Sequence, residues 1–321
     1  MIRLGTRGSA MALAQARAVA ALLGDEEVEI VPVVTTGDRD RARTDKEKWV
    51  KELELALLAD EVDLAVHSAK DVPAALPEGL ELVGAPVRGD ARDALCGAPS
   101  LDALPTGARV GTSALRRAAQ LRAVREDLDV VEVRGNVDTR LGKLAAGEVD
   151  ALVLTAAGLA RLGRADAIEG TLDSVPAAGQ GIVVLEARAE DAAARAAAVR
   201  VTDEEAWGCL ACERAVVRAL GASCHTPVGA HAALAGDLTP RAGRRAPARD
   251  RAGSAHSPDR DRLLVLETFV GLPDGSAWLR DRLEGPAAEP EALGERGAQR
   301  LLAAGARELL REAESAAQRA A

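Results

Sequence analysis

The sequence predicts an α/β protein with two lobes, each built on a mostly parallel sheet, followed by a small α+β C-terminal domain. From Ile2 to Glu186, short apolar segments alternate with amphipathic ones, which is the order expected for parallel strands with helices on the faces of the sheet. The chain has 321 residues, enough for two or three domains at roughly 100–200 residues each. Tyrosine is absent and phenylalanine occurs once, so the cores must consist of alanine, valine and leucine.

The first lobe is predicted from residues 1–88 together with a returning segment at 182–200. Ser9 has the side chain of a helix N-cap, and the helix after it extends to about Leu23 with its apolar residues on one face. The charged stretch Asp38 to Lys48 is interpreted as a solvated loop, with a mobile flap as the functional alternative. The other expected elements are strands at Ile2–Leu4, Val28–Val34, Leu64–His67 and Leu80–Pro86, and a helix at Trp49–Ala59.

The second lobe is predicted from residues 89–181. Its strands are expected at Arg109–Val110, Val130–Val133 and Ala151–Leu154, each followed by a helix. A glycine-rich connection, Val175–Gly181, leads to another strand at Ile182–Glu186. We expect that strand to return to the first sheet.

The third domain is predicted from residues 203–321. A helix is expected from Glu204 to Leu220, followed by a loop that contains Cys224. Residues 236–262 are rich in Arg, Asp, Pro and Gly and are interpreted as a disordered insertion. Strands near Ala230–Leu234, Leu263–Val270 and Trp278–Leu279 come before one C-terminal helix from about Glu289 to Ala317.

The composition excludes several classes of function. The formal net charge of -9 argues against general nucleic-acid binding, which needs a basic face, and stacking aromatics of the RNA-binding type are absent. The N-terminus has no apolar signal core, and no apolar run approaches the roughly 18 residues of a membrane span. The four cysteines are therefore expected to be free thiols or ligands in a cytoplasmic protein that does not contact a membrane.

A polar cluster follows the predicted strand at Leu64–His67. Within five residues, His67 to Asp71, the chain offers an imidazole, a hydroxyl, an ammonium and a carboxylate, and Pro73 then ends any regular element. Open α/β folds place their chemistry at such strand ends. Near arginines, Asp71 would be held ionised and could stabilise a cation or pass a proton to a leaving group. A charged surface turn, with Asp71 paired to Lys70, is the alternative.

Three strand-to-helix junctions combine a small flexible turn with arginine: Gly5–Ser9, Gly111–Ser113 with Arg116 and Arg117, and Arg134–Asn136. Helix N-termini hold anions, and arginine adds planar recognition of carboxylate or phosphate. One junction alone would be explained by helix capping, but three in two consecutive lobes favour a polyanion site between the lobes. Arg140 and Arg161 follow the same sheet edge, although either one alone would be interpreted as part of a solvated helix face.

Cys224 lies in a Gly/Ser/Pro loop rather than on an apolar face. A buried core thiol is the usual state of cysteine, whereas a loop thiol beside a basic site would be a nucleophile or an attachment point. Cys209, Cys212, Cys224 and His225 could also be counted as zinc ligands. However, Cys209 and Cys212 sit in a helical pattern and Cys224 is adjacent to His225, unlike spaced ligand pairs, so no metal is expected.

Taken together, these motifs resemble the porphobilinogen deaminase family, also called the hydroxymethylbilane synthases. The resemblance covers nearly the whole chain in the right order, which makes chance agreement improbable. The segments that carry it are Thr6–Ser9, Val66–Pro73, Gly111–Arg117, Arg134–Arg140, Ala178–Gly181 and Cys224 within its loop.

The resemblance implies two periplasmic-binding-protein-like lobes and a small third domain that carries a covalent dipyrromethane cofactor on Cys224. It implies a monomeric transferase of tetrapyrrole (haem) biosynthesis, which joins four porphobilinogen molecules head to tail into linear hydroxymethylbilane and releases four ammonia molecules. On this pattern Asp71 would assist the loss of ammonia. The residues expected to bind cofactor and substrate carboxylates, or to hydrogen-bond them, are Arg7, Ser9, Ser68, Lys70, Thr112, Ser113, Arg116, Arg117, Arg134, Arg140, Arg161 and Gln180.

Three features depart from the family pattern. The flap is short and charged at Arg43–Lys48, and Trp49, which could stack on a pyrrole, stands where a phenylalanine is usual. The polar insertion and His225 are further departures. The alternative function is a non-catalytic two-lobed binding protein for a small anion. It would explain the arginine junctions but gives no reason for Cys224 or for Asp71 in its setting.

Overall fold

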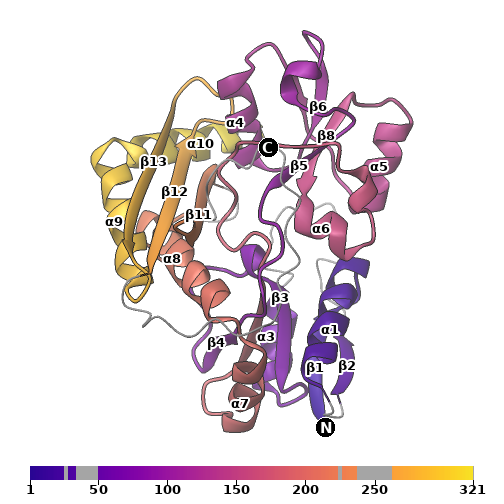
Figure 1. Ribbon diagram of the computed structural model, residues 1–321, viewed down its shortest axis with the longest axis vertical. Helices are drawn as coiled ribbons and strands as arrows, with labels where there is room; N and C mark the ends of the chain where they lie inside the picture. Colours follow the sequence, from indigo (N-terminus) through magenta and orange to yellow (C-terminus); the bar gives the residue numbers. More distant parts are fainter. Residues whose placement is uncertain (25–27, 34–49, 223–225, 237–261, 321) are drawn as a thin grey trace.

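Two five-stranded sheets and one three-stranded sheet form the framework of the described residues. The computed structural model describes residues 1–24, 28–33, 50–222, 226–236 and 262–320 (Figure 1). In Figure 1 the first sheet lies at the bottom of the molecule, the second at the upper right and the third at the left. The mixed α/β fold class predicted from the sequence is confirmed.

The first sheet has the strand order β2-β1-β3-β10-β4. Strand β1 pairs in parallel with β2 and β3, whereas β10 pairs antiparallel with both β3 and β4. One strand therefore runs against the other four. The expected return of the chain to this sheet after the glycine-rich connection is confirmed. The strands are β1 (Ile2–Arg7), β2 (Val28–Val33), β3 (Leu64–Ser68), β4 (Leu80–Gly84) and β10 (Val183–Arg188).

Helices cover both faces of the first sheet. One face packs against α1 (Ala10–Leu22) and α7 (Ala192–Val201), whose alanines let the helices approach the strands closely. The other face packs against α3 (Lys51–Leu58). The largest fully buried side chains of the described chain are leucines and one isoleucine, so the expected aliphatic core is confirmed.

The second sheet repeats the same plan with the order β7-β6-β8-β5-β9. Here β5 is the reversed strand, because it pairs antiparallel with both β8 and β9 while β6 pairs in parallel with β7 and β8. The sequence prediction missed β5 and β9. The strands are β5 (Asp93–Cys96), β6 (Arg109–Gly111), β7 (Asp129–Val131), β8 (Ala151–Thr155) and β9 (Gly170–Thr171), and the helices are α4 (Leu115–Val124), α5 (Val137–Ala145) and α6 (Ala156–Arg161).

The chain crosses between the two lobes twice, from β4 to β5 and from β9 to β10. The crossings touch where the N–H of Gly89 donates to the carbonyl oxygen of Gly181 at 3.0 Å. Gly181 has φ +87°, and a Cβ there would lie 2.5 Å from the oxygen of Gly89, so only glycine fits. Each crossing leads directly into the reversed strand of the next sheet.

The third sheet is antiparallel in the order β11-β12-β13 and packs against α8 and α9. The single C-terminal helix expected from the sequence is wrong, because α9 and α10 are separate helices. Gly305, with φ +102°, follows the last residue of α9 and turns the chain, which lets Ala306 and Leu310 pack on Val270. The elements are β11 (Val228–Leu234), β12 (Leu263–Gly271), β13 (Trp278–Pro286), α8 (Glu204–Leu220), α9 (Pro290–Ala303) and α10 (Ala306–Ala320).

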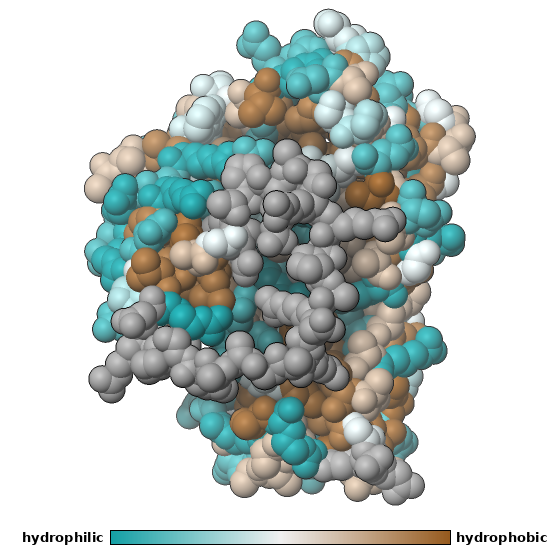
Figure 2. All heavy atoms as spheres, in the orientation of Figure 1, coloured by the Kyte–Doolittle hydropathy of each residue, from teal (hydrophilic) through white to brown (hydrophobic). Residues whose placement is uncertain are grey.

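The distribution of hydrophobic residues on the surface and in the helices is that of a protein whose apolar residues are buried in internal cores. Figure 2 shows hydrophobic residues in several separate patches among hydrophilic ones on the visible face. Across the described ranges, no helix combines the length and the apolar character that crossing a bilayer requires. The residue limits of the three domains stay a prediction.

Candidate active site

The carboxyl edge of the first sheet gathers the predicted polar residues of the first lobe. Strand β1 ends at Arg7, and Ser9 caps α1 by accepting a hydrogen bond from the N–H of Ala12 at 3.3 Å. Strand β3 ends at Ser68, whose Oγ accepts a hydrogen bond from Nε2 of the buried Gln15 at 2.8 Å. The expected N-cap is confirmed.

Lys70 and Asp71 lie in a short 3-10 helix, η2 (Ala69–Asp71), directly after β3. Both side chains are half-buried. The N–H of Ala69 donates to the carbonyl of Ile182 at 3.0 Å. Gly179 packs so closely that a Cβ there, at φ +73°, would lie 2.8 Å from the Cβ of Ala69. The second crossing therefore fixes one side of the Asp71 segment.

Arg116 and Arg117 lie in the first turn of α4, beyond the end of β6, and are almost fully buried. Both pair with Asp93, the first residue of the reversed strand β5. Arg116 Nη1 lies 2.8 Å from Asp93 Oδ2, and Arg117 Nη2 lies 2.8 Å from Asp93 Oδ1. Beside them Thr112 is buried and Ser113 is exposed. One internal carboxylate thus orients two of the predicted ligand-binding cations.

Asp93, the buried partner of two predicted site arginines, is the residue that the sequence interpretation missed. Its side chain is 0% exposed and also accepts hydrogen bonds from Ser174 Oγ at 2.7 Å and Gln180 Nε2 at 2.8 Å. Burial alone would raise the pKa of Asp93, but the charges of Arg116 and Arg117 outweigh it and hold the pKa well below its usual range. An acid at the start of the apolar run Ala94–Cys96 was the available signal, since a buried charge needs a partner.

Three further predicted arginines follow the carboxyl edge of the second sheet in different settings. Arg134 is exposed and pairs with Glu132 at 2.7 Å. Arg140 Nε donates to the carbonyl of Gly135 at 2.8 Å, and Arg161 Nη2 donates to that of Gly181 at 2.6 Å. Burial and then the charge of Arg117 lower the pKa of Arg140, while burial lowers the pKa of Arg161. The lowered pKa values indicate that the protein supplies little negative charge near these two guanidinium groups.

The arrangement fits an anionic ligand. Among the described residues, the five arginines 116, 117, 134, 140 and 161 form ion pairs with two carboxylates, those of Asp93 and Glu132. Arg161 also contacts the second crossing beside Gln180, and Arg116 contacts the side chain of Gln180, so these two cations lie at the junction of the two lobes. There α1 contacts α6, and Figure 1 shows the two helices next to each other. Carboxylates brought to this junction would supply the missing negative charge.

Two predicted residues, Trp49 and Cys224, lie outside the described residues, as do the charged flap and His225. Cys209 and Cys212 lie in α8 as expected and pack into the third core. Burial, and then Glu213, raise the pKa of both thiols, to about 12 for Cys209. Within the ranges that the structure covers, no group of three or more His, Cys, Asp or Glu residues is placed to hold a metal ion.

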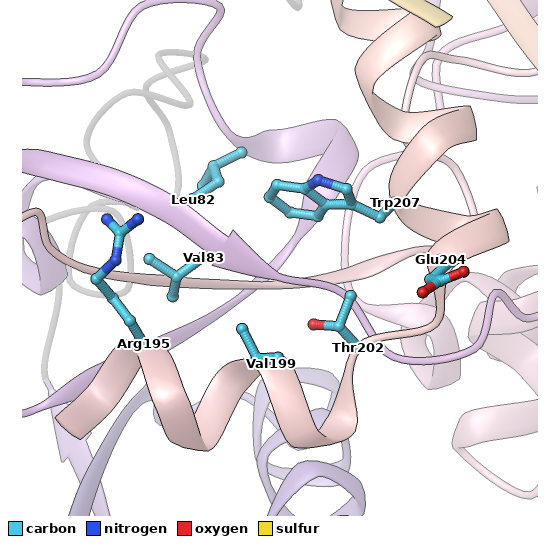
Figure 3. Close-up of a pocket in the computed structure, with 7 residues that line it drawn as sticks. All are labelled: Leu82, Val83, Arg195, Val199, Thr202, Glu204 and Trp207. Carbon is cyan, nitrogen blue, oxygen red and sulfur yellow. The ribbon is translucent and has the colours of Figure 1, made fainter. Parts of the chain in front are cut away.

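A cavity of about 270 Å³ lies away from these residues, between β4, α7 and the start of α8 (Figure 3). Trp207 and Leu82 line it together with Arg195 and Val199, and Figure 3 shows the indole ring of Trp207 directed toward Leu82. Its lining contains none of the predicted site residues. This cavity therefore lies apart from the residues predicted to form the active site.

Comparison with known proteins agrees with the geometry. A family model described as "Porphobilinogen deaminase, dipyromethane cofactor binding domain" matches residues 2–196, and one described as "Porphobilinogen deaminase, C-terminal domain" matches residues 207–303. The chain belongs to the porphobilinogen deaminase family. Porphobilinogen deaminases from Deinococcus radiodurans and Thiobacillus denitrificans are 41% and 42% identical to it, each over 96% of this chain and 97% of the relative.

The family resemblance found in the sequence motifs is thereby confirmed. The porphobilinogen deaminase of Thermus thermophilus is 40% identical over 97% of this chain and 98% of its own. Among solved structures, the methionine binding protein MetQ overlaps 62% of this chain and 89% of its own at 17% identity, with a TM-score of 0.41. A structural likeness this distant adds nothing to the functional assignment, which rests on the family.

Proposed function

We propose that this member of the porphobilinogen deaminase family is a hydroxymethylbilane synthase, a transferase of tetrapyrrole biosynthesis. It would join four porphobilinogen molecules head to tail into linear hydroxymethylbilane, with the release of four ammonia molecules. The observation that carries the proposal is the set of arginines along the carboxyl edge of the second sheet, which among the described residues outnumber the carboxylates paired with them. A substrate with acetate and propionate groups matches that excess.

The arginines of the second lobe would hold these carboxylates. Arg140 and Arg161 are half-buried and donate only to backbone carbonyls among their hydrogen bonds described above, so their charge is available to a ligand. Arg116 and Arg117 are fixed by Asp93, so they would need little reorganisation when a ligand arrives. Ser9, Ser68, Thr112 and Ser113 would add hydrogen bonds, together with Lys70, Arg7 and Gln180.

A dipyrromethane group fits the same donor set, because its side chains are carboxylates as well. We propose that it is attached to Cys224 through a thioether. When bound, it supplies the electron-rich pyrrole carbon to which the first substrate unit is joined. The arginines of the second lobe would hold its carboxylates, and they would keep the group oriented during successive additions.

Asp71 would act on the substrate that reacts. Departure of ammonia breaks the bond between the aminomethyl carbon and its nitrogen and leaves positive charge on the pyrrole. In its carboxylic acid form a side chain at this point can give its proton to the leaving nitrogen, and the carboxylate that remains stabilises the developing cation. The half-buried position of Asp71 after β3 would strengthen both effects relative to bulk water.

Incubation of the purified protein with porphobilinogen tests the proposal. We expect four ammonia molecules to be released for each hydroxymethylbilane formed, together with the pink-to-red colour that a protein-bound dipyrromethane gives with an aldehyde reagent. Saturable binding of porphobilinogen without ammonia release or colour would instead support a non-catalytic anion-binding protein. Monomeric state and cytoplasmic location stay predictions, which sedimentation and cell fractionation would test.

A further inference from the structure

The guanidinium of Arg214 reaches from α8 into the first lobe. It donates to three successive backbone carbonyls, those of Val72 at 3.3 Å, Pro73 at 2.8 Å and Ala74 at 3.1 Å. These residues follow Asp71 directly in the chain. A side chain from the third region of the molecule therefore holds the backbone next to the proposed acid.

The segment that Arg214 holds has little regular structure of its own. Val72 to Pro77 lies between η2 and β4 without helix or strand, and the two prolines in it have no N–H to donate. Carbonyl groups that no ladder satisfies need other donors. A guanidinium offers five N–H donors in a fixed planar fork, so a single arginine can fix three carbonyls at once.

Glu186 on the first sheet helps to keep the guanidinium of Arg214 charged. Burial, and then the nearby Arg218, lower the pKa of Arg214 to about 10, while the charge of Glu186 opposes this shift. Arg214 therefore remains protonated at neutral pH. Glu186 on β10 is fully buried, and its Oε2 lies 2.9 Å from Nε2 of His67 on β3. The same carboxylate therefore also contacts the strand that leads to Asp71.

The residue before Arg214 on α8 holds the other side of the Asp71 segment. Glu213 Oε2 accepts a hydrogen bond from the N–H of Gly179 at 2.6 Å, and Gly179 packs on Ala69 and Lys70. Glu213 also pairs with Arg88 of the first crossing at 2.7 Å. Two neighbouring residues of one helix thus fix η2 from the crossing and from the segment that follows it.

We propose that Arg214 is a positioning residue that sets the place of Asp71 relative to the anion-holding arginines. The inference rests on the proposed function and deepens it. Helix α8 ends at Leu220, four residues before Cys224 in the sequence. Arg214 therefore joins the helix that precedes the attachment residue to the loop that carries the acid.

The test compares Arg214→Gln and Arg214→Lys with Arg218→Gln in the full-length holoenzyme. Arg218 lies one turn further on the same helix, with its side chain 48% exposed and a carboxylate of Glu291 3.6 Å away. We expect Arg214→Gln to lower kcat by about tenfold to a hundredfold with little change in KM, because a small displacement of a reacting group costs rates of this order. Arg214→Lys keeps the charge but loses the planar fork of donors, so its kcat should lie between those of the wild type and Arg214→Gln. The kcat of Arg218→Gln should stay within about twofold of wild type.

A double-mutant cycle with Asp71→Asn separates positioning from general destabilisation. If Arg214 acts through Asp71, then Arg214→Gln should lower kcat almost no further in the Asp71→Asn background. Wild-type kcat in Arg214→Gln, or a loss that multiplies fully with that of Asp71→Asn, would overturn the inference. If Arg214→Gln does not fold, Arg214→Lys carries the same cycle. A wild-type protein without turnover would instead refute the proposed function itself.

Discussion

The two lobes share one strand order but carry different chemistry at their carboxyl edges. Each sheet has five strands, of which the fourth in order is reversed and is entered from the other lobe. In the first lobe, β3 ends at Ser68, and Lys70 and Asp71 follow it in η2. In the second, the strand ends are followed by arginines, two of them buried against Asp93. The first lobe thus offers an acid beside the cations Arg7 and Lys70, whereas the second offers a larger set of arginines.

We infer from this difference that Asp71 takes part in catalysis, whereas the arginines of the second lobe bind the anionic ligand. The charges that bind a polyanion must stay fixed through every addition, and burial on a shared carboxylate fixes Arg116 and Arg117. An acid that meets each new substrate must stay accessible, and Asp71 is only half-buried. Variants of Asp71 should therefore affect mainly kcat, whereas variants of the second-lobe arginines and of Asp93 should affect mainly affinity or stability.

The largest effect is expected for Asp71→Asn, which keeps the shape of the side chain but can neither ionise nor carry a transferable proton. Proton transfer by a positioned group contributes about 10²–10⁴-fold to rates, so kcat should fall by a factor in this range. Steady-state assays of ammonia release would measure it. The covalent cofactor should remain attached, as seen in the intact mass.

The exposed Glu78, seven residues further along the chain, provides the matched control. Glu78→Gln should leave kcat unchanged. Turnover near the wild-type level in Asp71→Asn would refute the catalytic assignment of Asp71.

The next effect in size is on stability, for Asp93→Asn. Removing one partner of a buried ion pair costs about 3–5 kcal/mol, so the free energy of unfolding should fall by this amount at pH 7 in urea titrations. The folded pKa of Asp93 is depressed, so its stabilisation is complete above the unfolded value of about 3.9 and is lost as pH falls below it. The deficit of the variant should therefore stay constant from pH 8 to 5 and shrink below about pH 4.

Asp127→Asn is the control, because Asp127 pairs with Arg125 at a partly exposed position where ion pairs contribute little. A deficit in Asp93→Asn that shrinks between pH 8 and 5 would contradict the account of Asp93. So would equal stability of the two variants.

Smaller effects are expected for Arg140→Gln and Arg161→Gln. A hydrogen bond to a charged group contributes about 1.5–3 kcal/mol, so the KM for porphobilinogen should rise roughly tenfold to a hundredfold with a smaller change in kcat. Initial rates across substrate concentrations would show the split. Arg134→Gln should do least, because Arg134 is exposed and shares its charge with Glu132. A change confined to kcat in Arg140→Gln and Arg161→Gln would contradict the division between the lobes.

Local signals in the sequence predicted much of the fold. The cap at Ser9 and the alternation of strands and helices follow from residue type and spacing, whereas the return of β10 to the first sheet was expected because two-lobed folds usually cross over twice. The junction arginines were recognised because strand ends and helix starts can be identified from the sequence. The break between α9 and α10 was also available, since Gly305 is a helix-ending residue.

The features that could not be predicted from the sequence depend on contacts between residues that are far apart in the chain. Strand β5 has only four residues and no polar alternation, so Asp93 could not be placed beside Arg116 and Arg117, which lie 23 and 24 residues away in the chain. Arg214 meets carbonyls 140 to 142 residues away. Its position on α8 was predicted, but its target depends on how the third region packs on the first lobe.

The most direct test of the central claim is the intact mass of the denatured wild-type protein beside Cys224→Ser. The account predicts an additional mass equal to two linked pyrrole units on the wild type and the bare polypeptide mass for Cys224→Ser. A wild-type protein that stays at the polypeptide mass after incubation with porphobilinogen or hydroxymethylbilane would contradict it. The same adduct on Cys224→Ser would contradict the assignment of the attachment site.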